Sequence, residues 1–106
     1  MAYDVLLTKD AERDLEEIYD YIAAQGDHAT ADSLLDRIEN ILDGLSDLPD
    51  QGSHPQELLE LGIRDYRQIL FDPFRLIYRV IDDRVIVYLI VDGRRDLQSL
   101  LARRLF

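Results

Sequence analysis

The chain has 106 residues, a net charge of −10 and no cysteine. This length allows one folded domain, which we place at residues 1–106, and the missing thiols exclude disulfides, a cysteine nucleophile and thiolate-bound zinc. The acidic surplus disfavours sequence-specific DNA binding by the chain alone, because lysine and arginine side chains drive the binding of phosphates.

The charge is divided unevenly along the chain. Residues 1–50 hold 14 acidic and 3 basic residues, a net charge of −11, whereas residues 51–106 hold 8 acidic and 9 basic residues, a net charge of +1. The acidic half therefore suits a basic protein partner. No segment resembles a signal peptide or reaches the roughly 20 apolar residues of a membrane span, so we expect a cytoplasmic protein that does not enter a membrane.

Alternation of apolar and polar residues predicts a short strand at residues 3–8. Apolar residues at helical spacing then predict a helix over residues 9–25 and a second helix that ends at about Leu48. Thr8 and Asp27 stand at the starts of these helices and are residue types that cap helix N-termini. The two helices should form an antiparallel hairpin.

The second half predicts a sheet. Residues 49–65 are irregular and rich in proline and glycine, with at most a short helical turn. Asp96 is a suitable cap for a last helix. Three runs of β-branched and aromatic residues predict strands at residues 66–71, 74–81 and 85–91. We therefore expect an α+β fold with an antiparallel four-stranded sheet, an N-terminal helical hairpin packed on it and a short C-terminal helix, in the order β-α-α-β-β-β-α.

Conventional catalytic chemistry has little support in the sequence. His28 and His54 lie in polar surroundings, and neither has a partner at the spacing of metal ligands. The carboxylates on one flank of the first helix are typical of a solvated surface. Residues 93–96 hold one glycine only and so lack the pattern of a dinucleotide-binding loop. We expect no metal and no cofactor.

The arginines remain as candidate functional residues. The middle strand alternates an apolar face with a face that carries Arg75 and Arg79. A hairpin closed at residues 72–73 brings Arg67 toward Arg75, and Arg95 follows the next strand, so three guanidinium groups could converge. Such groups bind phosphates and carboxylates through paired hydrogen bonds. The alternative is a set of ordinary exposed arginines that balance Asp65, Asp72, Asp82, Asp83 and Asp92.

The order of the predicted elements and several motifs resemble the RelE/ParE superfamily of bacterial toxins. The motifs are FRLIYRV at residues 74–80, the strand at residues 85–91 and GRRDL at residues 93–97. Residues 11–22 and 101–105 resemble the first helix and the ending of the ParE branch. The resemblance covers nearly the whole chain. It implies the toxin half of a type II toxin–antitoxin pair, neutralised by a small antitoxin whose C-terminal segment wraps the toxin.

The superfamily divides by target. Resemblance to its ribosome-dependent branch, which cuts messenger RNA, implies catalytic roles for Arg67, Arg75 and Arg95. In that branch a second basic residue and often a tyrosine stand where this chain has Ile69 and Leu101, and neither of these side chains can transfer a proton. Resemblance to the ParE branch implies an inhibitor of DNA gyrase that is not an enzyme, and we favour this interpretation.

The ParE interpretation predicts contact with gyrase through Arg94, Arg95, Arg103 and Arg104. It predicts that the antitoxin lies over the helical hairpin and the adjoining sheet edge, where the apolar positions are Ile18, Tyr19, Ile22, Leu34 and Ile38. Two alternatives stay open. One is a ribonuclease that acts on messenger RNA at the ribosome. The other is an inactive binding module of the same fold, supported by Asp92, which replaces a histidine found in many relatives.

Overall fold

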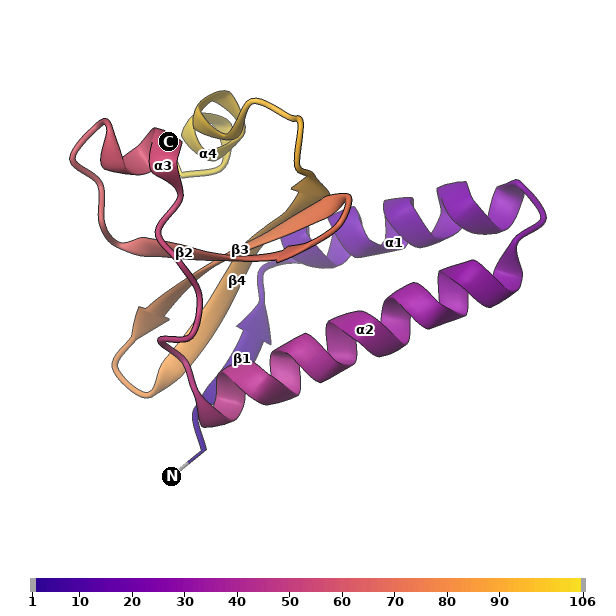
Figure 1. The fold of residues 1–106 in the computed structure, drawn as a ribbon, viewed down its shortest axis with the longest axis horizontal. Coiled ribbons are helices and arrows are strands. Elements are labelled where there is room, and N and C mark those ends of the chain that lie inside the picture. Colours follow the sequence, from indigo (N-terminus) through magenta and orange to yellow (C-terminus); the bar gives the residue numbers. More distant parts are fainter. Residues whose placement is uncertain (1, 106) are drawn as a thin grey trace.

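The computed structural model describes residues 2–105 and shows a four-stranded sheet with helices on both faces (Figure 1). The predicted order of elements is confirmed, with one additional short helix in the irregular segment. In chain order the elements are β1 (Asp4–Leu7), α1 (Lys9–Ala24), α2 (His28–Asp47), α3 (Gln56–Leu59), β2 (Tyr66–Phe71), β3 (Phe74–Ile81), β4 (Arg84–Asp92) and α4 (Leu97–Leu105).

The sheet is mixed, which corrects the prediction of a purely antiparallel sheet. Its strand order is β1-β4-β3-β2, and β1 runs parallel to β4 from the pair Asp4 and Arg84 to the pair Leu7 and Val87. The two hairpins join β2, β3 and β4 in antiparallel fashion, as predicted. No turn joins β1 to its neighbour, so its direction depends on where the helical hairpin brings the chain, which strand patterns do not encode.

Side-chain caps hold the starts of the long helices at the predicted residues. The Ala11 amide donates to Thr8 Oγ1 over 3.1 Å, and the Thr30 amide donates to Asp27 Oδ1 over 3.0 Å. Each bond satisfies one of the amides that lack a partner in the first turn of a helix. Gly26, with a φ of 84°, lies between the helices and allows the chain to reverse into α2.

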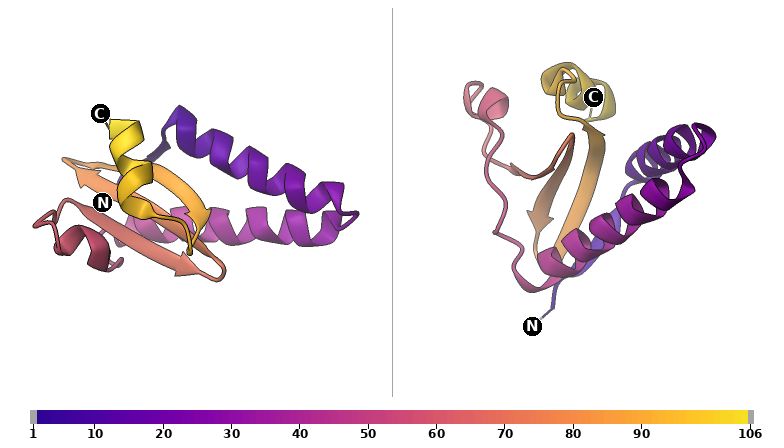
Figure 2. Two further views of the ribbon diagram at one scale, coloured as in Figure 1. Left: turned by 90° about the horizontal axis from the view of Figure 1, so that it is seen from above. Right: turned by 45° about the vertical axis from the view of Figure 1, so that its right-hand side comes forward.

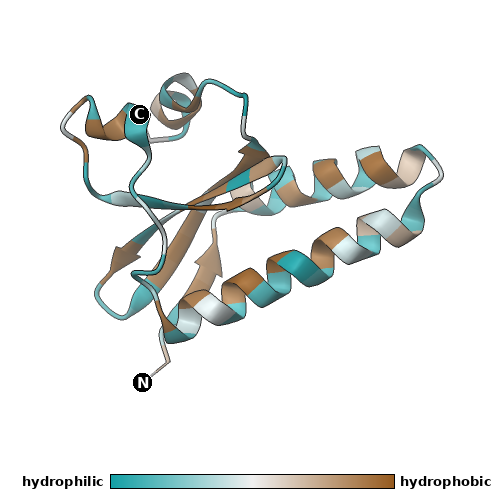
Figure 3. Cartoon of the chain, viewed as in Figure 1, coloured by the Kyte–Doolittle hydropathy of each residue, from teal (hydrophilic) through white to brown (hydrophobic). Residues whose placement is uncertain are grey.

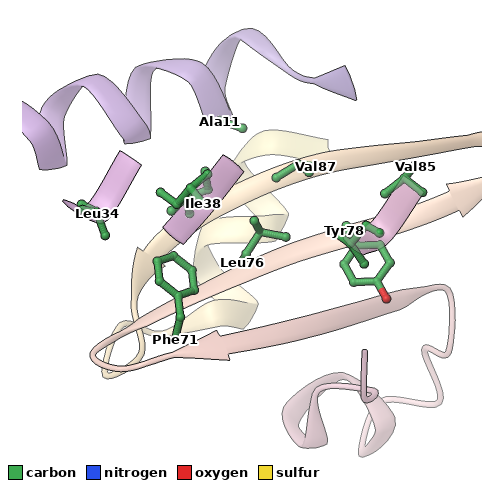
Figure 4. Packing of buried hydrophobic residues seen from close by; sticks show 10 residues of the cluster. Ala11, Leu34, Ile38, Phe71, Leu76, Tyr78, Val85 and Val87 are labelled. Atoms are coloured by element: carbon green, nitrogen blue, oxygen red, sulfur yellow. The ribbon is translucent and has the colours of Figure 1, made fainter. Parts of the chain in front are cut away.

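The helical hairpin covers one face of the sheet and extends beyond it (Figure 1; Figure 2). Hydrophobic residues recur along both helices and along the strands (Figure 3). Where these surfaces meet, Ile38 of α2 packs with Leu76 and Tyr78 of β3 and Val87 of β4 (Figure 4). All four side chains are essentially buried. The removal of apolar side chains such as these from water is the main favourable contribution to folding.

A second cluster fills the opposite face of the sheet, beneath α3 and α4. Leu97, Leu100 and Leu101 of α4 pack there against Ile77 of β3 and Leu89 of β4. β4 contains a bulge: Ile77 pairs with Leu89 and Tyr78 with Val87, so that Tyr88 has no partner opposite it. The extra residue lets Val87 face the first cluster and Leu89 face the second. β4 lies between β1 and β3 and is covered on both faces, which agrees with the absence of charged residues from residues 85–91. Within residues 2–105, no helix has the length and apolar content needed to cross a bilayer.

Candidate functional site

A groove of about 760 Å³ lies between the helical hairpin and one end of the sheet and is here called the hairpin groove. Its walls come from α1 and α2, from the turn between β2 and β3, and from the end of β4. Most of its surface is apolar. A groove of this kind is suited to an apolar helix face of a partner.

Three of the five residues predicted to contact an antitoxin line the hairpin groove, namely Ile18, Ile22 and Leu34. The other two do not. The Tyr19 hydroxyl donates to Asp32 Oδ1 over 2.9 Å, which ties α1 to α2 and raises the pKa of the tyrosine, whereas Ile38 is only 1% exposed in the core. Ile38 is thus a core residue that belongs to the same buried cluster as Leu34 and is not accessible to a partner.

Sequence periodicity missed Tyr21, which lies in the wall of the groove and is 69% exposed. It falls outside the apolar stripe of α1, so the rule that identifies core positions assigns it to solvent. A signal was nevertheless present, because a large aromatic residue on an otherwise acidic helix face is unusual on a surface and is typical of partner contacts.

Charged side chains stand at the rim of the groove, and two of its carboxylates are already paired. Asp14 binds Arg104, and Asp92 binds Arg94. Arg37 lies with its guanidinium carbon 5.6 Å from the ring centre of Phe71, and Arg95 closes the wall beyond β4. The groove therefore combines an apolar floor with a rim of both charges.

Arg75 is neutralised inside the protein. Its Nη1 and Nη2 donate to the two carboxylate oxygens of Glu57 over 2.9 and 2.8 Å, while Nε and Nη2 donate to Gln68 Oε1. These bonds hold the pKa of Glu57 below its usual value, although partial burial opposes the shift. Arg75 is 9% exposed, so its guanidinium group ties α3 to the sheet and is not presented to a ligand.

The predicted convergence of Arg67, Arg75 and Arg95 is wrong, because the three side chains line three different hollows. Arg67 pairs across the ladder with Tyr78, whereas Arg75 pairs with Leu70, and an odd spacing between residues on one strand places them on opposite faces. Arg67 Nη1 donates instead to the carbonyl oxygens of Asp50 and Gly52, over 3.2 and 2.8 Å.

The four arginines predicted to contact the target divide into two pairs. Arg104 binds Asp14 through two nitrogens and Tyr88 O through Nη1, and Arg94 folds back onto Asp92. The bonds from Arg94 lower the pKa of Asp92. Arg95 and Arg103 are exposed and form no ion pair within residues 2–105. These two guanidinium groups are therefore available to a partner.

The positions that decide between the two branches are apolar and packed. Ile69 packs against the cluster under the helical hairpin, and Leu101 is 4% exposed in the cluster under α4. His54 places Nδ1 3.1 Å from the carbonyl oxygen of Tyr66, so this nitrogen carries the proton and donates. Within the described part of the chain, no three acidic or histidine side chains are grouped to hold a metal.

The strand order and the projecting helical hairpin define a small α+β domain with an apolar groove. The family described as "ParE toxin of type II toxin-antitoxin system, parDE" matches residues 5–97. The chain therefore belongs to the ParE toxin family. A comparison with curated proteins gives no match.

Several solved structures share this fold, and two of them come from toxin–antitoxin systems. A chain of the chromosomal ParDE toxin–antitoxin system from P. aeruginosa has a TM-score of 0.70 and 21% sequence identity to this protein. The matched region covers 86% of this protein and 96% of the P. aeruginosa chain. A chain of the RelBE2 toxin–antitoxin complex from Mycobacterium tuberculosis has a TM-score of 0.54 at 20% identity, covering 90% of this chain and 95% of that one. At these identities the likeness concerns the fold.

Proposed function

We propose that this protein is the toxin of a type II toxin–antitoxin pair and that a small antitoxin holds it inactive by filling the hairpin groove. The observation that carries the proposal is the groove itself, an open and mainly apolar space of about 760 Å³ in a member of the ParE family. Both structural neighbours come from toxin–antitoxin systems.

The shape of the groove favours an amphipathic helix as the bound antitoxin segment. Ile18, Ile22 and Leu34 supply its apolar floor, and the exposed ring of Tyr21 stands beside them. A helix that inserts apolar residues at spacings of three and four would cover these side chains. Burial of an exposed aromatic ring at such a contact is a frequent source of binding energy.

Calorimetric titration with the antitoxin encoded beside the toxin gene tests this proposal. Tyr21→Glu should weaken binding at least about thirtyfold, the equivalent of about 2 kcal/mol. Leu61→Glu is the matched control, because Leu61 is similarly exposed at 58% and lies outside the groove. Equal affinities of the two variants would place the antitoxin elsewhere.

DNA gyrase is the target that we propose, in preference to the ribosome. Three features support this choice over messenger RNA cleavage. Arg75 is held by Glu57, while Ile69 and Leu101 are packed apolar residues that cannot transfer protons. Arg95 and Arg103 then carry the contact with the target, since each is an exposed guanidinium group without an ion pair in residues 2–105.

The test compares gyrase supercoiling with cell-free translation at equal concentrations of the purified toxin. We expect inhibition of supercoiling alone, and Arg95→Ala with Arg103→Ala should weaken it by about tenfold or more, given about 1–2 kcal/mol for lost charged hydrogen bonds. Arg13→Ala removes an exposed charge on α1 and serves as control. Inhibition of translation with cut messenger RNA would instead support the ribonuclease, and activity in neither assay would support an inactive binding module.

A further inference from the structure

A third hollow, of about 280 Å³, lies at the other end of the sheet from the hairpin groove. Its lining includes Arg64, Arg67, Arg79 and His54, and we call it the arginine hollow. The groove borders the start of β3 at Phe74, whereas the hollow borders the end of β3 at Arg79. The two sites are therefore separated by the length of that strand.

Neutral groups position three of these side chains. Arg67 donates to two backbone carbonyl oxygens through Nη1, and the His54 ring is fixed by the carbonyl oxygen of Tyr66. Arg79 lies with its guanidinium carbon over the ring of Tyr66, 5.9 Å from the ring centre, which is within the range of a cation–π contact. These contacts orient Arg67 and Arg79 without cancelling the charge of either guanidinium group.

This arrangement differs from that of the other buried or clamped arginines. Arg75 and Arg104 each donate two bonds to a single carboxylate at distances below 3 Å. In the arginine hollow, the nearest carboxylate contact is 3.8 Å from Arg67 Nε to Asp50, whose side chain is 79% exposed. A contact that is so long and so exposed to water compensates little charge.

The arginine hollow differs from the two larger hollows in the net charge of its lining residues. Its lining holds three arginines against Asp50 and Asp65, a net charge of +1, in a chain whose net charge is −10. The hairpin groove holds four carboxylates against two arginines, and the hollow around Arg75 holds two carboxylates against one. A local excess of positive charge in an acidic protein points to an anionic ligand.

We propose that the arginine hollow binds one phosphate group, either of a free phosphate compound or of a nucleic-acid backbone. Guanidinium groups match phosphate oxygens through paired N–H bonds, and Arg64 and Arg79 bring two such groups to this lining. The volume of about 280 Å³ admits a phosphate head and leaves the rest of the ligand outside. This site uses neither the groove nor Arg95, so it is independent of the proposed toxin function.

The test is an NMR titration of the full-length protein with inorganic phosphate, and separately with a short single-stranded oligonucleotide, at constant ionic strength. Amide signals of residues 53–54 and 64–67 should shift in a saturable way. A dissociation constant of about 1 mM is expected for phosphate. Arg64→Gln and Arg79→Gln should each weaken binding by about tenfold. Arg13→Gln removes the same charge from α1 and should change affinity less than twofold.

Each result decides the proposal. Shifts with phosphate assign the ligand to free phosphate compounds, whereas shifts at the same residues with the oligonucleotide alone assign it to a nucleic-acid backbone. Because Arg64 is exposed and has no ion pair within residues 2–105, its variant should remain folded even if Arg79→Gln disturbs Tyr66. No saturable shift with either probe, or equal losses in Arg64→Gln and Arg13→Gln, would overturn the proposal.

Discussion

Asp14 in α1 accepts hydrogen bonds from both terminal nitrogens of Arg104 in α4, over 2.7 and 2.6 Å, across 90 residues of sequence. The same carboxylate accepts the amide of Ile90, which lies beyond the end of β1 and so has no strand on that side. One aspartate therefore completes the backbone pairing of β4 and holds the C-terminal helix. We call this ion pair of Asp14 and Arg104 the clamp. Its paired hydrogen bonds raise the pKa of Arg104.

Removing the clamp should destabilise the protein. Arg104→Ala leaves the mostly buried carboxylate of Asp14 without its counter-charge, and we expect a loss of about 2 kcal/mol, less than for a fully buried pair because water reaches part of it. Urea unfolding measures the change. Arg103→Ala in the next position of the same helix is exposed and should stay within about 0.5 kcal/mol of the wild type. Equal stabilities of the two variants would show that the clamp contributes nothing.

Much of the fold follows from local sequence rules. Helix starts were predictable because Thr8 and Asp27 satisfy amides that any helix leaves open. The three consecutive strands were predictable because turn residues separate runs of β-branched and aromatic side chains. The parallel placement of β1 was not, because it depends on the packing of two whole helices.

The arginine partners could not be predicted for a similar reason. Glu57 lies in α3, a single helical turn within the irregular segment, and meets Arg75 only after that segment folds over the sheet. Asp14 and Arg104 come from opposite ends of the chain. The sequence shows which arginines face outward from a strand, but ion pairs between distant segments depend on how those segments pack.

Acid should weaken the contact between α3 and the sheet. Arg75 lowers the pKa of Glu57, so the unfolded chain, with a glutamate pKa of about 4.3, binds the proton more readily than the native state. The stability from this contact is therefore present above about pH 4.3 and is lost as the pH falls through the lowered pKa.

Unfolding of Glu57→Gln between about pH 3 and 7 measures this effect. The wild type should exceed the variant in stability most clearly above about pH 4.3, and the gap should narrow in acid. Glu60→Gln, an exposed glutamate near the end of α3, should show no such narrowing. A gap that stays constant with pH would mean that the ion pair does not contribute through the charge of Glu57.

The buried hydroxyl of Tyr78 should stabilise the segment that follows α2. It donates to Pro49 O over 2.7 Å and accepts the Gly52 amide over 3.0 Å, and burial raises the pKa of its phenol. Tyr78→Phe leaves the buried Gly52 amide without a partner, which should cost about 1–2 kcal/mol. Hydrogen exchange at Gly52 should accelerate. Tyr19→Phe removes an exposed hydroxyl bond and should have little effect on stability.

Gly52 should resist substitution because three atoms occupy the space that a side chain needs. A Cβ there would lie 2.6 Å from the Tyr78 hydroxyl oxygen, 2.9 Å from Tyr78 Cε1 and 2.7 Å from Gln68 O, and Gln68 O also accepts the Ser53 amide. We expect Gly52→Ala to cost about 1–3 kcal/mol in urea unfolding. Gly44→Ala is the control, since an alanine in α2 would meet only the flexible end of Gln51.

Combining Gly52→Ala with Tyr78→Phe separates the two contacts. The double variant lacks the hydroxyl oxygen, so one of the three close contacts disappears and the hydrogen bond is lost only once, while the contacts with the ring carbon Cε1 and with Gln68 O remain. Its cost should therefore be smaller than the sum of the single costs by about 0.5–2 kcal/mol. Strictly additive costs would show that the hydroxyl oxygen of Tyr78 adds nothing to the strain of an alanine at position 52.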